Sequence, residues 1–95
     1  MENTNLLLKE LEIKIEAIKF KYETLFKNSS KTLEEFLQEN YQKIRSELAK
    51  ISTETLHLGI LNNTSTEEFI EQTLTLNFEN VYKLLNDLKK ISEEK

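Results

Sequence analysis

The chain has 95 residues, a single glycine, no proline and no cysteine, and its formal net charge is −4 from 13 basic and 17 acidic side chains. This length suits one domain, and the scarcity of glycine and proline argues against the many tight turns of an all-β fold. The acidic balance and the lone arginine, Arg45, argue against a nucleic-acid-binding surface, which needs a basic stripe.

A first helix is predicted over residues 5–27, because apolar side chains recur there at steps of three and four residues. They make a heptad stripe of the kind found in coiled coils. Its members are Leu8, Leu11, Ile15, Ile18, Tyr22 and Leu25.

A second helix is predicted over residues 32–58. Thr32 followed by Glu35 forms the pattern of a capping box at its start. Gly59 follows the last apolar residue of its stripe, Leu58, and is expected to close the helix in a left-handed conformation.

A third helix is predicted over residues 66–92, opened by a capping box of Ser65 and Glu68. Asn77 falls on its heptad stripe, which has two interpretations. Either a buried asparagine sets the register of the helices, or the helix is rotated there and Phe78 fills the core instead. The whole stripe is Ile70, Leu74, Asn77, Val81, Leu84, Leu88 and Ile91.

The predicted fold class is all-α, with a single domain over residues 1–95. Short connections imply that consecutive helices are antiparallel neighbours, so the expected architecture is an antiparallel three-helix bundle. The alternative is a helical chain that closes its core only by oligomerisation, since a chain of this size builds a marginal core alone.

Catalysis is not expected from this sequence. His57 is the only histidine, and with no cysteine and no second histidine it lacks the partners of a zinc site or a nucleophilic site. The paired glutamates lie off the apolar stripes, and Glu-x-x-His motifs of di-metal helical bundles are missing. We therefore predict a non-enzymatic protein without a metal or a cofactor, and with His57 at the surface.

The first helix carries a second apolar stripe opposite its heptad stripe. Leu6, Ile13 and Phe20 repeat every seven residues, with Ala17 nearby. A three-helix bundle surrounds none of its helices, so this stripe should be exposed and should bind a partner or a surface. The alternative is that the first helix is wedged between the others by one broad apolar face.

From Tyr22 onward the chain resembles the phasins, small helical proteins that coat polyhydroxyalkanoate granules in bacteria. The similarity lies in Ser65 to Glu68, in Gln72-Thr73, in Asn77-Phe78-Glu79 and in the Lys89-Lys90 end. The chain departs from that family in lacking its alanine-rich character and the proline before the last helix. The resemblance implies a non-enzymatic coat on an apolar granule surface.

Two functions are thus expected from the sequence. The first is a phasin-like amphipathic protein that covers an apolar surface or forms a homo-oligomer. The alternative is a small interaction module, such as a secretion chaperone, an inhibitor or a phage or plasmid adaptor, that binds a protein partner. No signal peptide and no membrane-length apolar run are recognisable, which predicts a cytoplasmic protein without a transmembrane segment.

Overall fold

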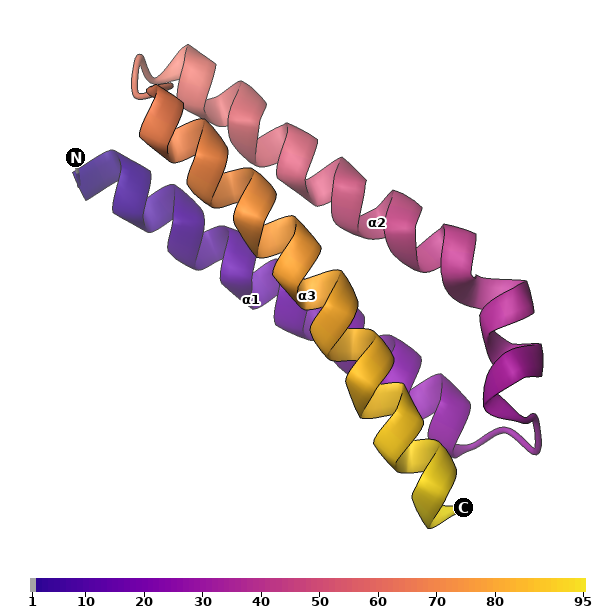
Figure 1. The fold of residues 1–95 in the computed structure, drawn as a ribbon. Helices are drawn as coiled ribbons and strands as arrows, with labels where there is room; N and C mark the ends of the chain where they lie inside the picture. Colours follow the sequence, from indigo (N-terminus) through magenta and orange to yellow (C-terminus); the bar gives the residue numbers. More distant parts are fainter. Residues whose placement is uncertain (1) are drawn as a thin grey trace.

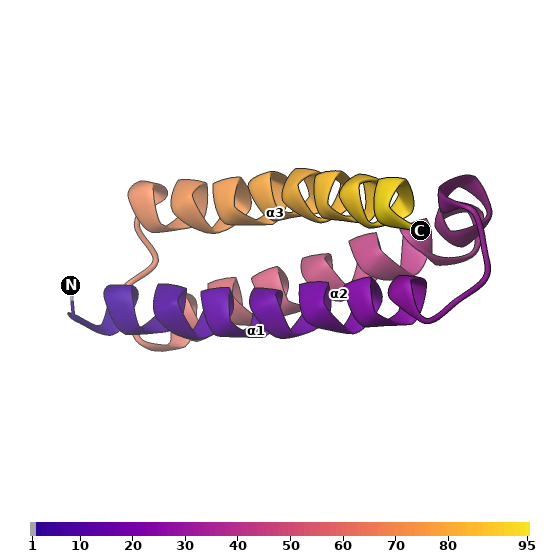
Figure 2. The ribbon, with the colours of Figure 1, turned by 90° about the horizontal axis from the view of Figure 1, so that it is seen from below.

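The computed structural model describes residues 2–95, which form three helices and confirm the all-α three-helix bundle (Figure 1). α1 spans Glu2–Lys27, α2 spans Leu33–Leu61 and α3 spans Glu67–Glu94. Each helix packs against both others, and the Cα atoms extend over 47 × 19 × 17 Å (Figure 2). The core closes within one chain, so an open chain that needs a partner to bury its core is not the architecture.

α2 and α3 both begin at a capping residue, as predicted, but at α3 this residue is not the predicted one. The capping box at α2 is confirmed: Thr32 accepts from the backbone N–H of Glu35, whose carboxylate accepts from the N–H of Thr32. At α3 the predicted box is wrong, because Thr66 rather than Ser65 is the N-cap and accepts from the N–H of Phe69. α2 and α3 also continue beyond the predicted ends.

The buried residues depart from the predicted heptad stripe near the C-terminal end of α1 and near the N-terminal end of α3. Leu25 is half exposed, while its neighbour Phe26 is fully buried. On α3, Phe69 and Thr73 are buried, whereas Ile70 and Leu74 turn outward. A straight helix falls about 20° behind a heptad stripe per seven residues, so the buried face moves to the neighbouring position.

Gly59 is buried inside α2 rather than at its end. A Cβ atom there would lie 2.4 Å from Cε2 of Phe69, so the missing side chain lets α3 approach α2 closely. The left-handed residue after the helix is Asn63, with φ 55°. Three backbone bonds close this turn, donated by the N–H groups of Asn62, Asn63 and Thr64 to the carbonyls of Leu58, Ile60 and Gly59 respectively.

Asn77 joins α3 to α2. Its side-chain amide donates to the carbonyl of Leu48 at 3.0 Å and to the hydroxyl of Ser52 at 2.8 Å. Phe78 points to solvent, so the alternative in which it fills the core is wrong. The amide satisfies a carbonyl and a hydroxyl across the helix pair and thereby favours one register.

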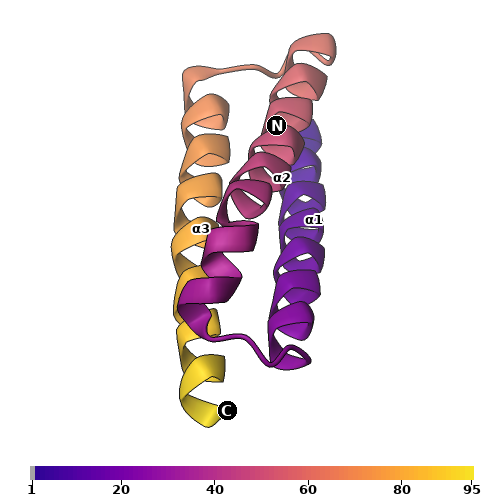
Figure 3. The same ribbon diagram turned by 90° about the vertical axis from the view of Figure 1, so that its right-hand side faces the viewer.

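The two ends of the bundle have different cores. At the end that holds Phe26, the first turns of α2 bend relative to the rest of the helix (Figures 1 and 3). Phe36 in these turns packs on Phe26 with ring centroids 4.9 Å apart. The amide of Asn40 donates to the carbonyl of Phe36, a local bond that competes with the helical ladder. At the opposite end, which we call the Gly59 end, the buried residues include Ser52, Thr55, Gly59 and Thr73.

Lys95 ties the end of the described chain to the α1–α2 loop. Its ammonium donates to the carbonyls of Phe26 and Lys31, each at 3.0 Å. It also lies 4.0 Å from the centroid of the Phe26 ring. A cation at the carbonyl end of a helix is stabilising, so this contact fastens α3 to the end of the bundle that holds Phe26.

Candidate binding surface on the first helix

α1 is apolar on two opposite sides. Its inner side is buried against α2 and α3 through Leu7, Leu11, Ile15, Tyr22 and Phe26. Its outer side carries the second stripe predicted from the sequence, here called the outer stripe and defined as Leu6, Ile13 and Phe20 together with Ala17.

The outer stripe is exposed. Leu6 exposes 57%, Ile13 69% and Phe20 71% of its surface, and Ala17 is exposed as well. The expected exposure is therefore confirmed, and the alternative of a wedged first helix is wrong. Leu6, Ile13 and Phe20 follow one another at about 10 Å along the axis, at about 1.5 Å per residue.

Charged side chains border the outer stripe. The surface neighbours of Ile13 are the residues three and four positions away on either side. Lys9 and Glu16 lie on one flank, where they line a shallow hollow beside Ile13, and Glu10 and Ala17 lie on the other. The outer stripe is thus apolar at its centre and carries both signs of charge on one edge.

Contacts between α1 and α2 fix the rotation of α1, so that the outer stripe stays turned away from the bundle. Glu47 of α2 accepts from the ammonium of Lys21 at 2.7 Å and from the hydroxyl of Tyr22. Burial of the phenol and the bond to Glu47 both raise the pKa of Tyr22. The hydroxyl therefore stays protonated and remains a donor to Glu47.

Glu23 of α1 and Glu47 of α2 should change the stability of the protein in opposite directions as the pH changes. Burial and then the charge of Asp87 raise the pKa of Glu23. Burial alone would raise the pKa of Glu47, but the bonds from Lys21 and Tyr22 outweigh it and lower that pKa. A carboxyl group whose pKa is raised by folding stabilises the protein below its unfolded pKa of about 4.3, and this contribution is lost as the pH rises through the folded pKa. A carboxyl group whose pKa is lowered by folding stabilises the protein above about pH 4.3, and this contribution is lost as the pH falls through the folded pKa.

We therefore expect the Glu23→Gln variant to be more stable than the wild type at pH 7, with the gain vanishing below about pH 4. The Glu47→Gln variant should lose stability at pH 7 and lose less in acid. Urea unfolding followed by circular dichroism at pH 7 and pH 3.5 measures both. Equal effects at the two pH values would contradict the assigned directions.

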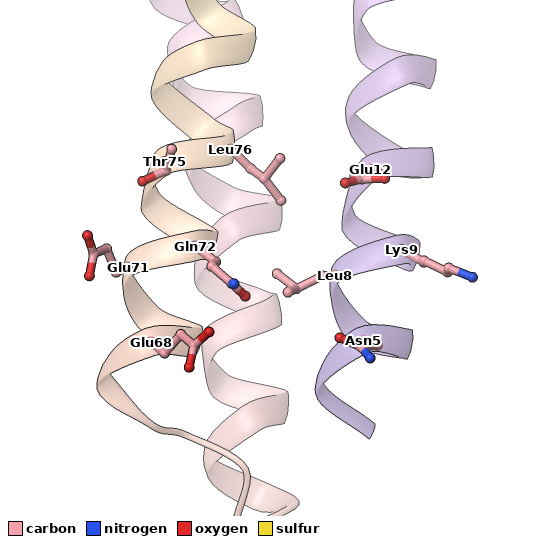
Figure 4. Close-up of a pocket in the computed structure, with 9 residues that line it drawn as sticks. All are labelled: Asn5, Leu8, Lys9, Glu12, Glu68, Glu71, Gln72, Thr75 and Leu76. Atoms are coloured by element: carbon pink, nitrogen blue, oxygen red, sulfur yellow. The ribbon is translucent and has the colours of Figure 1, made fainter. Parts of the chain in front are cut away.

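A second feature is the groove between α1 and α3 near their N-terminal ends. It has a volume of about 740 Å³. Leu8 and Leu76 point into the space between the two helices, and Gln72 extends toward Leu8 (Figure 4). Glu12, Glu68, Glu71 and Lys9 also belong to the lining. The groove therefore contains two leucines and a glutamine and is bordered by mainly acidic residues.

A third apolar surface lies on α3 and was not predicted from the sequence. Leu74 and Phe78 line a shallow groove with Ala49 and Leu56 of α2. Exposed apolar residues at steps of four form what we call the α3 face, namely Ile70, Leu74, Phe78 and Tyr82. The heptad interpretation hid it, because it assigned Ile70 and Leu74 to the core.

The described side chains gather at no candidate metal site. Among residues 4–95, whose side chains the structure describes, no group of three or more histidine, aspartate or glutamate side chains is placed to hold a metal ion. His57 is exposed on α2. None of the helices within residues 2–95 is long and apolar enough to cross a bilayer.

The chain matches no protein-family model, and comparisons with curated proteins and with solved structures found no similar protein. The protein can therefore be described only by its fold and by the residues exposed on its surface. It is a small three-helix bundle with apolar side chains exposed on its first and third helices.

Proposed function

We propose that this protein acts without catalysis, as a cytoplasmic helical protein that covers an apolar surface or associates with itself through the outer stripe. The exposure of Leu6, Ile13 and Phe20 on a helix that already buries an opposite stripe carries this proposal. Burying apolar area stabilises by about 25 cal/mol per Å², so even three such side chains favour adsorption. The resemblance to phasins supports the same function, with the apolar granule as the surface.

The acidic groove supports a second candidate, an interaction module for a protein partner. Its apolar floor of Leu8 and Leu76 and its rim of Glu12, Glu68 and Glu71 suit a basic amphipathic helix. Opposite charges across such an interface raise the association rate and select the partner. Lys9 and Glu12 border both surfaces, but Ile13 does not line the groove and Leu76 does not line the hollow beside Ile13, so mutations at these two residues can separate the two functions.

The proposed function is tested by combining Ile13→Lys with Phe20→Lys. Each change places an ammonium in the centre of the outer stripe, and loss of two anchoring side chains costs about 1–2 kcal/mol each. Self-association or adsorption should therefore weaken by about two orders of magnitude. Sedimentation velocity measures the first, and depletion from solution by oil droplets in water measures the second.

A matched control combines Phe78→Lys with Tyr82→Lys, because these side chains are as exposed as Phe20 and lie on α3. Circular dichroism checks that both variants keep their helices. The control should behave as the wild type does. If the outer-stripe variant retains wild-type association and adsorption, the proposed function is wrong, and a loss confined to the control would move the surface to α3.

A further inference from the structure

The groove between α1 and α3 contains carboxylates that pair with no cation among the described residues. Glu12, Glu68 and Glu71 line it, and they take part in none of the ion pairs that residues 4–95 form. Lys9 is the one basic residue of the lining, and its ammonium extends away from α3 rather than into the groove (Figure 4). The groove therefore presents uncompensated negative charge beside its two leucines.

Acidic residues lie at both ends of the apolar part of the groove. Figure 4 shows Glu68 of α3 at the level of Asn5 of α1, with Leu8 and then Glu12 further along α1. Asn5 and Glu12 are seven residues apart in α1, which corresponds to about 10 Å along the helix axis. One carboxylate from each wall therefore brackets the segment that the leucines line, at a separation of about two helical turns.

This spacing matches one side of an amphipathic helix laid in the groove. Residues seven positions apart on a helix lie on the same side, two turns from each other, with a residue of the turn between them on that side as well. An apolar residue in the middle position would contact Leu8 and Leu76. Lysine or arginine at the two outer positions would reach Glu68 and Glu12, because these long side chains cover apolar surface with their stems while their charged ends extend outward.

The charge of the groove discriminates against other helices. An acidic helix would place like charges opposite Glu12 and Glu68, and such juxtapositions suppress binding of the wrong partner. A neutral helix would cover the leucines but leave both carboxylates without a cation at the edge of the interface. A basic helix alone satisfies the apolar and the charged parts of the groove together.

We propose that the groove between α1 and α3 binds a helix of a partner protein that presents one apolar residue between two basic residues seven positions apart. This inference rests on the second candidate function above and names the side chains by which the partner is recognised. Glu12 and Glu68 select the basic residues, and Leu8 and Leu76 hold the apolar one. The lining comes from α1 and α3 alone, so the bound helix packs on these two helices.

Synthetic peptides test the recognition pattern directly. The probe is an alanine-based peptide of about 18 residues, long enough to be helical, with one leucine between two lysines seven positions apart. One comparison peptide carries glutamates in place of the lysines, and another carries serine in place of the leucine. Fluorescence anisotropy at low salt should show binding of the probe, with each comparison peptide binding about tenfold more weakly or less.

Variants of the protein assign the selectivity to the groove. Combining Glu12→Gln with Glu68→Gln removes two charges while keeping the size of the side chains, so the affinity for the lysine peptide should fall by about three- to tenfold at low salt. The difference from the wild type should shrink at high salt, because salt screens exposed charges. The matched control combines Glu54→Gln with Glu93→Gln, which changes the net charge equally at exposed positions outside the groove and should lose less than about twofold.

Amide NMR spectra of the protein locate the bound peptide. Shift changes should centre on Leu8, Gln72 and Leu76, whereas changes centred on the outer stripe or on the α3 face would overturn the inference. Equal affinities for the lysine and glutamate peptides, or equal losses in the two double variants, would also contradict it.

The same measurements separate this inference from the functions on which it builds. If the glutamate peptide binds at Leu8 and Leu76 as tightly as the probe, the groove remains a binding site for a helix and only the stated chemistry of the partner is wrong. If none of the peptides binds at the groove, the inference and the second candidate function both fail. Adsorption through the outer stripe is decided independently by combining Ile13→Lys with Phe20→Lys.

Discussion

Replacing Phe26 with alanine is expected to lower the free energy of unfolding by about 3–5 kcal/mol, the usual cost of removing a buried aromatic ring. Phe26 is fully buried, packs on Phe36 and lies beneath the ammonium of Lys95. Because small domains are stable by only about 5–15 kcal/mol, the variant should be close to unfolded at 37 °C. Urea denaturation followed by circular dichroism, at a fixed low protein concentration, measures the change.

The matched control is Phe20→Ala on the same helix. Phe20 is mostly exposed, so its removal should change the stability of the monomer by no more than about 0.5 kcal/mol. It should nevertheless weaken self-association, because Phe20 belongs to the outer stripe. Equal losses of stability in the two variants would mean that the two sides of α1 are not distinct.

The Gly59→Ala variant is expected to be less stable than the wild type by about 1–3 kcal/mol, the typical cost of overpacking a core. Alanine normally stabilises a helix by about 1 kcal/mol relative to glycine, so helix propensity alone predicts the opposite sign. The added Cβ would lie 2.4 Å from Cε2 of the buried Phe69 ring, and α2 and α3 would have to separate. Thermal and urea unfolding give the sign directly.

A double-mutant cycle assigns this cost to Phe69. Phe69→Leu removes the ring atoms that the new Cβ would meet, so the double variant should be less destabilised than the sum of the single changes, by about 0.5–3 kcal/mol. His57→Ala, two residues before Gly59 and exposed, is the control and should be nearly neutral. A stabilised Gly59→Ala variant would show that the helices accommodate the methyl group.

The helices and their order could be predicted from the sequence, because apolar periodicity and the Thr32 capping box are local signals. The exact inner face could not be predicted. Phe26 and Phe69 are buried while Leu25 and Ile70 turn outward, since the helices do not follow a strict heptad repeat over their full length. The role of Gly59 also required the structure, because it depends on Phe69 in another helix.

The outer stripe could be predicted because α1 has two apolar sides in its own sequence. The α3 face and the groove between α1 and α3 could not. The α3 face can be recognised only when the rotation of α3 is known, and Leu8 and Leu76 line the same groove only because of tertiary packing. The periodicity of apolar residues in a sequence identifies the faces of one helix, but it gives no information about grooves between two helices.

The small buried residues of the Gly59 end bear on how the protein opens. Apart from Phe69, the buried residues of α2 and α3 at this end are small, and Ser52, Thr55 and Thr73 contribute less apolar contact than Phe26 and Phe36 do at the opposite end. Local opening of a native protein follows such differences, so transient fraying should start at the Gly59 end. Leu6 lies near that end, so binding at the outer stripe, as proposed above, would also restrain the segment that opens most easily. Such binding would slow amide hydrogen exchange most where the free protein protects its backbone least.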